Sequence, residues 1–387
     1  MTRQRVKRSP AILIGGCAYG AGNIGDEGIL SGLLAMIRQV APNARIGVLA
    51  VDPKEVRRMH DVEAWPRDLS YRLFQTMRQF DVFLCGGATL ADDSLGKGYP
   101  IRRCVSQILM ARLLGLRVMI TAIGANRFRT REGAFWVRFC YGTANRITVR
   151  DAASRDVLVN VGIKREIVVS ADPAFLVEPD PLEIGNRALT ESGIILNEQP
   201  LVGVSVVNEK YGMQKEYKRA IAAACDALIE ERNVIPVFVS HDMRPEYDIV
   251  AVNETLSYMK HRQAAKILQR RFYSPSTMLS VISHFEMALG MRMHFLIFAA
   301  SVGVPFAALS RVDKVDNFCS LFGLRPLASV ENARPEPFAR AVLDQYDRRS
   351  EMAAQLPSKH NTLKSAAMRT GDVLAHLLQE VRERNNG

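Results

Sequence analysis

Short apolar runs alternate with amphipathic segments along most of this chain, and no other sequence feature constrains the fold as strongly. In the first half the apolar runs lie at residues 11–15, 46–51, 82–85, 118–122, 146–149 and 167–170. Helical periodicity fills the intervals, for example at residues 101–114 and 132–141. Strands that alternate with helices usually pair in parallel through right-handed crossovers. The first half therefore predicts an α/β fold with a doubly wound sheet.

The same alternation restarts after a break that contains three prolines, at residues 172–182, and we expect the polar stretch up to Pro200 to continue this linker. Further strands are expected at residues 201–207, 234–240, 285–289 and 306–310, with helices at 216–231, 247–259 and 295–301. A chain of 387 residues is also too long for one ordinary core. We therefore expect two Rossmann-like domains that face a cleft lined by the carboxyl ends of their strands. The expected division is a basic tail at 1–10, domains at 11–180 and 181–335, and carboxyl-terminal helices at 336–387.

Composition indicates a globular protein in a reducing compartment. Hydrophobic residues make up 48% of the chain and charged residues 24%, as in ordinary soluble proteins. The most apolar stretch, at residues 108–117, carries two arginines, and the first residues lack a secretory signal. Six scattered cysteines show no C-x-x-C spacing, which predicts reduced thiols and neither a disulfide framework nor a zinc site. We expect a cytoplasmic protein.

The chain is strongly basic, with a net charge of +11. Such a charge favours anionic partners, such as a phosphorylated substrate or an anionic membrane surface. Nucleic acid is the least favoured of these partners, because aromatic content is only 7% and no nucleic-acid-binding motif is present.

A Gly-x-Gly-x-x-Gly pattern at residues 20–25 follows the first expected strand and opens a helix. Asp52, at the end of the second expected strand, stands where a dinucleotide fold places its ribose-binding carboxylate. Asp26 and Glu27 argue against a dinucleotide, because they occupy the positive end of the helix dipole, where a pyrophosphate would have to bind. We expect the loop to shape the cleft floor, with Asp26 capping the helix or contacting sugar hydroxyls.

Two polar residues, Arg292 and His294, interrupt the apolar segment FEMALGMRMHFLIFAASVGVP at residues 285–305. The expected strand ends near residue 289 and the helix begins near His294, so both side chains should project from the carboxyl end of a strand. A guanidinium there can hold a carboxylate or phosphate through two hydrogen bonds. An adjacent imidazole can donate or accept a proton near neutral pH. The pair is therefore a candidate active-site element.

Six short motifs occur in one order along the chain. They are GAGNIGDEGIL at 20–30, DVFLCGG at 81–87, TVRD at 148–151, ADPA at 171–174, Arg292-x-His294, and Val304-Pro305 followed by Lys314. Together they resemble the polysaccharide pyruvyl transferase family. The resemblance covers about residues 12–325. It implies a glycosyltransferase-B-like pair of domains. It also implies transfer of a pyruvyl or enolpyruvyl group from phosphoenolpyruvate to sugar hydroxyls, as a ketal, with release of phosphate.

The resemblance also implies roles for individual residues. His294 matches the histidine regarded as the acid that protonates the enol. Phosphoenolpyruvate carries two anionic groups, for which Arg292, Lys314 and Arg150 are candidate ligands, and Glu209 or Asp26 is the candidate base. The remaining substrate-binding candidates are the motif residues Gly22, Asn23, Gly25, Gly86 and Gly87. The reaction requires neither a nicotinamide nor a metal.

A cell-surface or exopolysaccharide precursor is the expected acceptor. Such precursors are usually built on a lipid carrier, so the basic residues Arg3, Arg5, Lys7 and Arg8 are candidates for contact with the inner membrane face. The alternative is a disordered tail.

Two other functions remain open. A nucleotide-sugar glycosyltransferase would need a carboxylate late in the second domain, where Glu286 and Asp313 are the poorly placed candidates. A non-catalytic saccharide-binding member is the other, because the chain departs from the family pattern at Ala88, 125–129 and 207–209.

Overall fold

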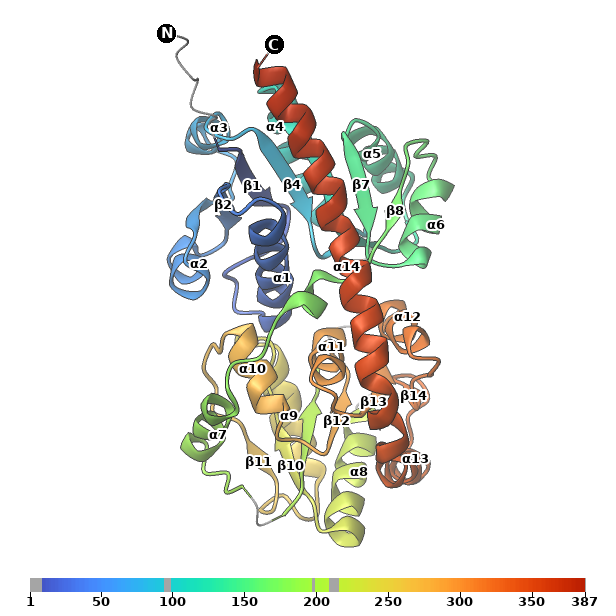
Figure 1. The fold of residues 1–387 in the computed structure, drawn as a ribbon. Helices are drawn as coiled ribbons and strands as arrows, with labels where there is room; N and C mark the ends of the chain where they lie inside the picture. Colours follow the sequence, from blue (N-terminus) through green and yellow to red (C-terminus); the bar gives the residue numbers. More distant parts are fainter. Residues whose placement is uncertain (1–8, 94–98, 197–198, 209–215, 387) are drawn as a thin grey trace. The chain divides into compact units, whose positions relative to one another are not determined.

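The computed structural model describes residues 9–93, 99–196, 199–208 and 216–386, which form two compact units (Figure 1). Of these residues, unit 1 comprises those at 9–21, 29–176 and 363–386, and unit 2 comprises those at 22–28 and 177–362. Each unit is built around one parallel β-sheet with helices packed against it.

The sheet of unit 1 has the strand order β3-β2-β1-β4-β6-β7-β8, with β5 paired to β6. Every strand pair is parallel. The strands are β1 (Ala11–Gly15), β2 (Arg45–Ala50), β3 (Glu63–Pro66), β4 (Val82–Gly86), β5 (Thr89–Ala91), β6 (Arg117–Ala125), β7 (Arg146–Val149) and β8 (Val168–Val169). The central strands β1 and β4 are buried throughout, which explains their continuous apolar sequences.

The helices of unit 1 cover both faces of its sheet. They are α1 (Ile24–Val40), α2 (Pro53–His60), α3 (Tyr71–Met77), α4 (Tyr99–Leu113), α5 (Arg131–Gly142) and α6 (Ala152–Asn160). The chain leaves β1 toward one sheet edge and β4 toward the other, so right-handed crossovers place α1 and α2 on one face and α3 to α6 on the opposite face. The long helix α14 (Arg349–Asn386) packs on the α1 face, where Gly371 lies against Met36 and Val40.

Unit 2 repeats this plan with the strand order β11-β10-β9-β12-β13-β14, again parallel throughout. Its strands are β9 (Leu201–Ser205), β10 (Ile235–Phe238), β11 (Lys266–Ile267), β12 (Met287–Gly290), β13 (Phe306–Ser310) and β14 (Ala328–Ser329). Its helices are α7 (Leu182–Glu191), α8 (Glu216–Arg232), α9 (Asp248–Tyr258), α10 (Pro275–Ile282), α11 (Met293–Ser301), α12 (Asp313–Leu321) and α13 (Pro335–Asp347). The expected α/β architecture with two parallel sheets is confirmed.

The break between the two sheets is more structured than the sequence predicted. Residues Pro173–Leu176 form a buried 3-10 turn, and the stretch up to Pro200, expected to be a linker, contains α7. That helix packs on α10, where the backbone N–H of Gly185 donates to Ser280 Oγ at 3.0 Å. A side chain at Gly185 would lie 2.4 Å from the Ser280 carbonyl oxygen, so this contact requires glycine.

The contact-defined units also differ from the division expected from sequence order. Residues 22–28 were placed in the amino-terminal domain but pack with unit 2, and residues 336–387 do not form a separate group. Instead, α13 packs against α8 in unit 2, and residues 363–386 of α14 pack in unit 1. Tertiary contacts between segments far apart in the sequence decide these assignments, and the order of elements along the chain does not reveal them.

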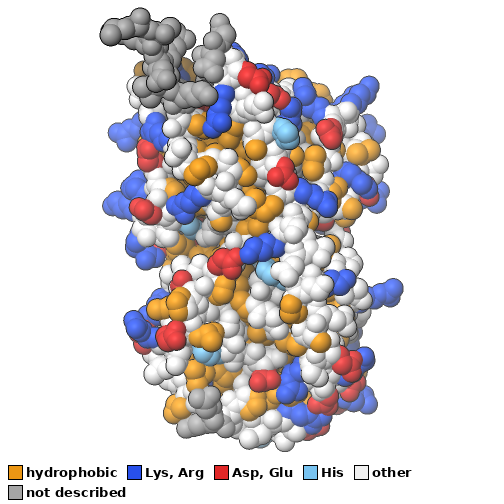
Figure 2. Space-filling view, viewed as in Figure 1, with side chains coloured by type: hydrophobic (Ala, Val, Ile, Leu, Met, Phe, Trp, Pro, Cys, Tyr) orange, Lys and Arg blue, Asp and Glu red, His pale blue; other side chains and the backbone are white. Residues whose placement is uncertain are grey.

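The six cysteines are all buried in the cores, as expected for small apolar residues. No helix within the described ranges is long and apolar enough to span a membrane. On the face drawn in Figure 2, basic side chains are spread over the surface and do not form one cluster.

Gly86, at the end of β4, provides a test of the fold. A Cβ atom there would lie 2.0 Å from the carbonyl oxygen of Thr121 on β6. We expect Gly86→Ala to lower the free energy of unfolding by about 1–3 kcal/mol, measured by urea denaturation. Gly142→Ala is the matched control, because nothing lies within 4 Å of its added Cβ, and its stability should be unchanged or higher. Equal stabilities for the two variants would contradict the β4–β6 packing.

Candidate functional site

Polar side chains gather where the strands of unit 2 end. His241 and Asp242 follow β10, Arg292 follows β12, and Lys314 follows β13 in the first turn of α12. Because the strands are parallel and β10, β9, β12 and β13 are neighbours, their carboxyl ends share one sheet edge. The candidate site lies at this edge.

The glycine-rich segment is joined to this edge by backbone hydrogen bonds. The N–H of Ile24 donates to the His241 carbonyl oxygen at 2.9 Å, and the N–H of Met243 donates to the Gly22 carbonyl oxygen at 2.8 Å. Asn23 and Asp242 thus form an antiparallel bridge. Gly22 has a φ of +85°, in the left-handed region that favours glycine. Residues 22–28 are therefore part of the unit 2 site, although the first strand of that unit, β9, begins 173 residues after Gly28.

Gly25 and His294 are in direct contact. A Cβ atom on Gly25 would lie 2.4 Å from His294 Nδ1, so the imidazole occupies the space that a side chain would need. Asn23 fixes this turn, because its Oδ1 accepts the N–H of Gly25 at 3.0 Å. The predicted residues Gly22, Asn23, Gly25 and His294 are thus brought together. Each of the first three has a role in positioning the helix start or the histidine.

Arg292 is held by a buried carboxylate. Its Nε donates to both oxygens of Asp248, at 3.0 and 3.2 Å, and its Nη2 also donates to Asp248. Nη2 lies 3.5 Å from an oxygen of Asp242 as well. Asp248 is fully buried and accepts the backbone N–H groups of His241 and Asp242. The edge of the guanidinium that we expected to grip a substrate anion is therefore occupied by Asp248, and a substrate would meet the remaining Nη donors.

A second arginine belongs to the same network. Arg244 binds Asp242 in a bidentate pair, with Nε–Oδ1 at 2.8 Å and Nη2–Oδ2 at 2.6 Å, and lies over the Tyr247 ring. The Arg244 side chain is 43% exposed, so it presents positive charge to solvent beside the buried pair. The hydrogen bond to Asp242 outweighs desolvation and, with the charges of Asp242 and Asp26, raises the pKa of Arg244 above its ordinary value.

Asp26 contributes to this network through its charge. Burial opposes the charge of Arg292, but Asp248, Asp242 and Asp26 outweigh it and raise the pKa of the guanidinium. Asp26 therefore lies near both arginines, in the first turn of α1. Asp26 was expected to cap this helix or to contact sugar hydroxyls. In the first turn of the helix, the backbone N–H of Gly25 donates to Asn23 Oδ1. Contact of Asp26 with sugar hydroxyls stays a prediction.

His241 is the buried neutral group of the site. Its ring packs edge-on against Phe295, with centroids 5.2 Å apart, and among the described residues neither ring nitrogen has a hydrogen-bond partner. Burial, followed by the charges of Arg292 and His294, lowers the pKa of His241 well below 6.5. The imidazole is therefore uncharged near neutral pH.

Of the remaining predicted residues, Lys314 shares the unit 2 sheet edge, whereas Arg150 belongs to unit 1. Arg150 is buried in unit 1 at the end of β7, where it contacts Thr89, Asp151 and Asp172. Lys314 is half-buried near the start of α12 in unit 2. Glu209 lies outside the described residues. The roles of these three residues stay predictions.

Gly86 and Gly87 are packing residues of unit 1. Gly86 accepts the Tyr19 hydroxyl at 2.9 Å, and a Cβ on Gly87 would lie 2.1 Å from the side chain of Ile29. Asp52, the carboxylate that suggested a dinucleotide, caps α2 by accepting the N–H groups of Lys54 and Glu55. Its carboxylate is thus engaged by the backbone.

The two carboxylates considered for a nucleotide-sugar enzyme stand at opposite ends of the unit 2 sheet. Glu286 precedes β12 and so lies at the opposite end of that strand, where it pairs with Arg349 at 3.1 Å. Asp313 is exposed at the start of α12.

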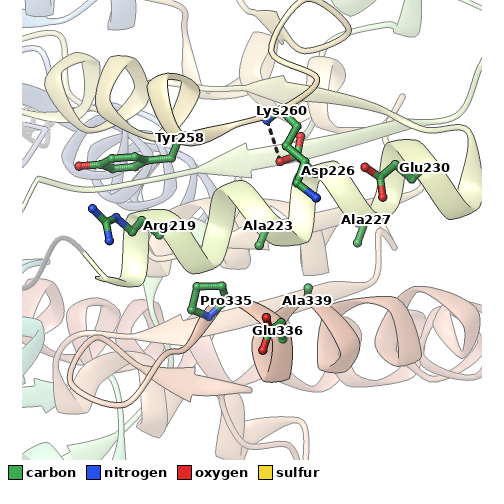
Figure 3. Close-up of a pocket in the computed structure, with 10 residues that line it drawn as sticks. All are labelled: Arg219, Ala223, Asp226, Ala227, Glu230, Tyr258, Lys260, Pro335, Glu336 and Ala339. Atoms are coloured by element: carbon green, nitrogen blue, oxygen red, sulfur yellow. Dashed lines mark hydrogen bonds between the residues drawn. The ribbon is translucent and has the colours of Figure 1, made fainter.

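A separate surface groove of about 460 Å³ lies among α8, α9 and α13 (Figure 3). Its lining combines alanines with charged residues, and Asp226 accepts the backbone N–H of Lys260 at 2.9 Å. None of the candidate-site residues lines it. Within the described ranges, no group of three or more His, Cys, Asp or Glu side chains is arranged to hold a metal ion.

Sequence reasoning missed His241, Asp242, Arg244 and Asp248. A signal was present, because the segment HDMR begins directly after an expected strand, at the sheet edge where sites of this fold form. The pairing of Asp248 with Arg292 cannot be predicted from a local sequence motif, because 44 residues separate the two.

Comparison with known proteins identifies the family. The family model described as polysaccharide pyruvyl transferase matches residues 23–313, about three quarters of the chain, from the loop at Asn23 to the start of α12. The chain belongs to the polysaccharide pyruvyl transferase family. No curated protein sequence matches it.

Solved structures with little sequence identity share the fold. S. aureus MnaA with UDP has a TM-score of 0.66 at 11% identity, covering 96% of this chain and 97% of that one. The UDP-GlcNAc 2-epimerase of Methanocaldococcus jannaschii has a TM-score of 0.63 at 14% identity, with 95% and 99% covered. The E. coli ADP-heptose LPS heptosyltransferase II has a TM-score of 0.50 at 15% identity, with 88% and 99% covered. These similarities confirm the glycosyltransferase-B-type fold.

The contact between Gly25 and His294 can be tested by a double-mutant cycle. We expect Gly25→Ala alone to lower the free energy of unfolding by about 1–3 kcal/mol, because the new methyl group meets the imidazole. In the His294→Ala background the same change should cost less than about 0.5 kcal/mol. Additive effects in urea denaturation would show that the two residues are not in contact.

His241 predicts a pH dependence of stability. The pKa of His241 in the folded protein lies well below 6.5. At low pH this histidine therefore binds a proton in the unfolded chain but not in the folded protein. Stability should be unaffected by this group above the unfolded pKa and should fall by about 1.4 kcal/mol per pH unit below it. We expect His241→Phe to remove this part of the slope, measured by urea denaturation between about pH 7.5 and about pH 5.5. Parallel slopes for the two proteins would indicate that His241 is protonated when folded.

Proposed function

We propose that this protein transfers a pyruvyl group from phosphoenolpyruvate to sugar hydroxyls of a cell-surface or exopolysaccharide precursor, forming a cyclic ketal. The observation that carries the proposal is the contact of His294 with the glycine segment, beside Arg292 at the start of α11. This arrangement gives a proton donor a fixed position next to a cation at the carboxyl edge of a sheet. Family membership supplies the reaction class.

The chemistry requires one proton donor and one base. His294 delivers a proton to the C3 methylene carbon of phosphoenolpyruvate while an acceptor hydroxyl attacks C2. A second hydroxyl of the same sugar then attacks C2, the bond from C2 to the phosphate oxygen breaks, and inorganic phosphate leaves. Of the two hydroxyl protons, one restores His294 and the other leaves with the phosphate. Among the described residues, Asp26 is the candidate base, and it lies close to both arginines. It takes each proton from the attacking hydroxyl before the proton reaches His294 or the phosphate.

The anionic groups of the donor need fixed cations. Asp248 orients Arg292 and leaves the far side of its guanidinium to the substrate, while the half-exposed Arg244 adds a second cation. We assign Lys314 and Arg150 to the same task as further candidates. Because no hydride moves and phosphate is the leaving group, the reaction proceeds without a nicotinamide or a metal.

The proposed acceptor is carried on a lipid, so the protein works in the cytoplasm at the inner membrane face. The net charge of +11 supports this location, since that leaflet is negatively charged. The basic tail, which the sequence analysis expected to contact lipid, lies outside the described residues.

The test is transfer in D2O with phosphoenolpyruvate and short, water-soluble saccharide acceptors that mimic the precursor. We expect phosphate release that depends on the acceptor, and a ketal whose methyl group carries one deuterium by mass spectrometry. His294→Gln should lower the rate by at least about 100-fold without unfolding the protein. His284→Gln, on the other side of β12, is the matched control and should leave the rate unchanged.

Two results would contradict the proposal. One is ketal formation that His294→Gln does not slow. The other is sugar transfer that depends on a nucleotide sugar in place of phosphoenolpyruvate, which would favour a glycosyltransferase.

A further inference from the structure

Two neighbouring helices of unit 1, α4 and α5, carry exposed and half-buried apolar side chains that the catalytic proposal does not use. We define the α4–α5 patch as Leu109, Met110 and Leu113 of α4 with Phe135, Trp136 and Phe139 of α5. Leu113 is 88% exposed, Phe135 58% and Phe139 49%. Single exposed apolar residues are common on soluble proteins, but a contiguous group marks an interaction surface.

The aromatic side chains form one continuous group. The rings of Phe135 and Phe139 are stacked, with centroids 6.2 Å apart and an angle of 7° between them, and Trp136 meets both rings edge-on. Trp136 also packs on the core with Leu109 and Met110, which anchors the group to the unit. The patch is thus a fixed feature of the fold.

The two helices run side by side. Both follow strands of the same parallel sheet on the same face, and Arg102 of α4 pairs with Glu132 of α5 at 3.3 Å. Leu113 lies three and four residues after Met110 and Leu109, so it continues the same helical face. Helix α14, which covers the opposite face of the sheet, leaves the patch exposed.

The segment that carries the patch is almost purely basic. Residues 99–143 contain eight arginines, no lysine and a single acidic residue, Glu132. Six of these arginines are exposed: Arg102, Arg112, Arg127, Arg129, Arg131 and Arg138. On α5, Arg131, Phe135 and Arg138 are spaced by four and three residues, so arginines and aromatic rings share one face.

We propose that the α4–α5 patch is the surface by which this protein binds an anionic lipid bilayer. Phenylalanine, tryptophan and leucine enter the interface between headgroups and acyl chains, while arginines at the border bind the anionic headgroups. A second copy of the chain is a poor occupant, because a two-fold contact would bring the two sets of arginines together. The biological role of this membrane binding rests on the proposed function, in which the acceptor is linked to a lipid. The test of binding itself does not depend on that function.

Binding is measured by flotation of the full-length protein with vesicles. We expect binding to vesicles of phosphatidylcholine with phosphatidylglycerol, weak binding to phosphatidylcholine alone, and loss of binding as salt screens the arginines. The double variant Phe135→Ser/Phe139→Ser should bind the anionic vesicles at least about tenfold more weakly. Its control, Leu182→Ser/Ile195→Ser, removes two apolar side chains of similar exposure on unit 2 and should bind as the parent protein does.

A second pair of variants tests the charges. Arg131→Gln/Arg138→Gln should weaken binding to anionic vesicles by about tenfold, since each arginine near the surface contributes separately. Arg325→Gln/Arg340→Gln removes two exposed arginines of unit 2 and should have no effect. Binding that survives both patch variants, but is lost when Arg3, Arg5, Lys7 and Arg8 are all changed to Gln, would overturn the inference.

Trp136 supplies a direct reporter. The chain has two tryptophans, so Trp65→Phe leaves Trp136 as the only one. Its fluorescence should shift to shorter wavelength with anionic vesicles and be quenched by brominated lipids. No quenching, self-association through the patch, or tighter binding to single-stranded nucleic acid than to vesicles would each overturn the inference.

The outcome can be separated from that of the proposed function. Phosphate release with a water-soluble acceptor should be unchanged in the patch variants, because they lie outside the catalytic site. Conversely, vesicle binding should persist in His294→Gln. Failure of one proposal therefore leaves the other open to its own test.

Discussion

The backbone pairing between residues 22–24 and residues 241–243 is the interaction on which the site depends. It joins a segment near the amino terminus to the loop after β10, and so sets the start of α1 at the carboxyl edge of the unit 2 sheet. Once this position is fixed, Gly25 lies against the imidazole of His294. The glycine at position 25 thus allows the backbone of α1 to approach the imidazole ring closely. This role differs from the binding of a pyrophosphate by a glycine-rich loop.

The same loop organises the charges. Asp248 begins α9 and accepts two backbone N–H groups from the loop, while its oxygens hold Arg292. A buried ion pair of this kind contributes little net stability, because desolvation offsets much of the attraction. The effect of the pair here is to orient Arg292, because the guanidinium can offer a substrate only the N–H groups that Asp248 does not bind. Removing Asp248 would leave a buried cation without its main partner, which is far more costly than the pair itself is stabilising.

The sequence predicted the main strands because each is a continuous apolar run. β1, β7 and β13 match their expected bounds. Short edge strands such as β11 and β14, with two residues each, carry no periodic signal and form only because a neighbouring strand offers a partner. Helix α7 was missed because prolines precede it, although its apolar residues follow a helical period. The site shows the same limit: Arg292 and His294 are found from a motif, whereas Asp248 acts through a contact that only tertiary structure creates.

Charge is distributed differently at the candidate site of unit 2 and on the surface of unit 1. At the unit 2 site, Arg244 and Arg292 are matched by Asp242 and Asp248, with Asp26 nearby. The site network therefore does not account for the net charge of +11. Residues 99–143 alone have a balance of +7, and the same segment carries exposed arginines and exposed aromatic rings. Part of the excess charge thus belongs to a surface, where it acts at long range on an anionic partner, while the site retains balanced charges that orient individual donors.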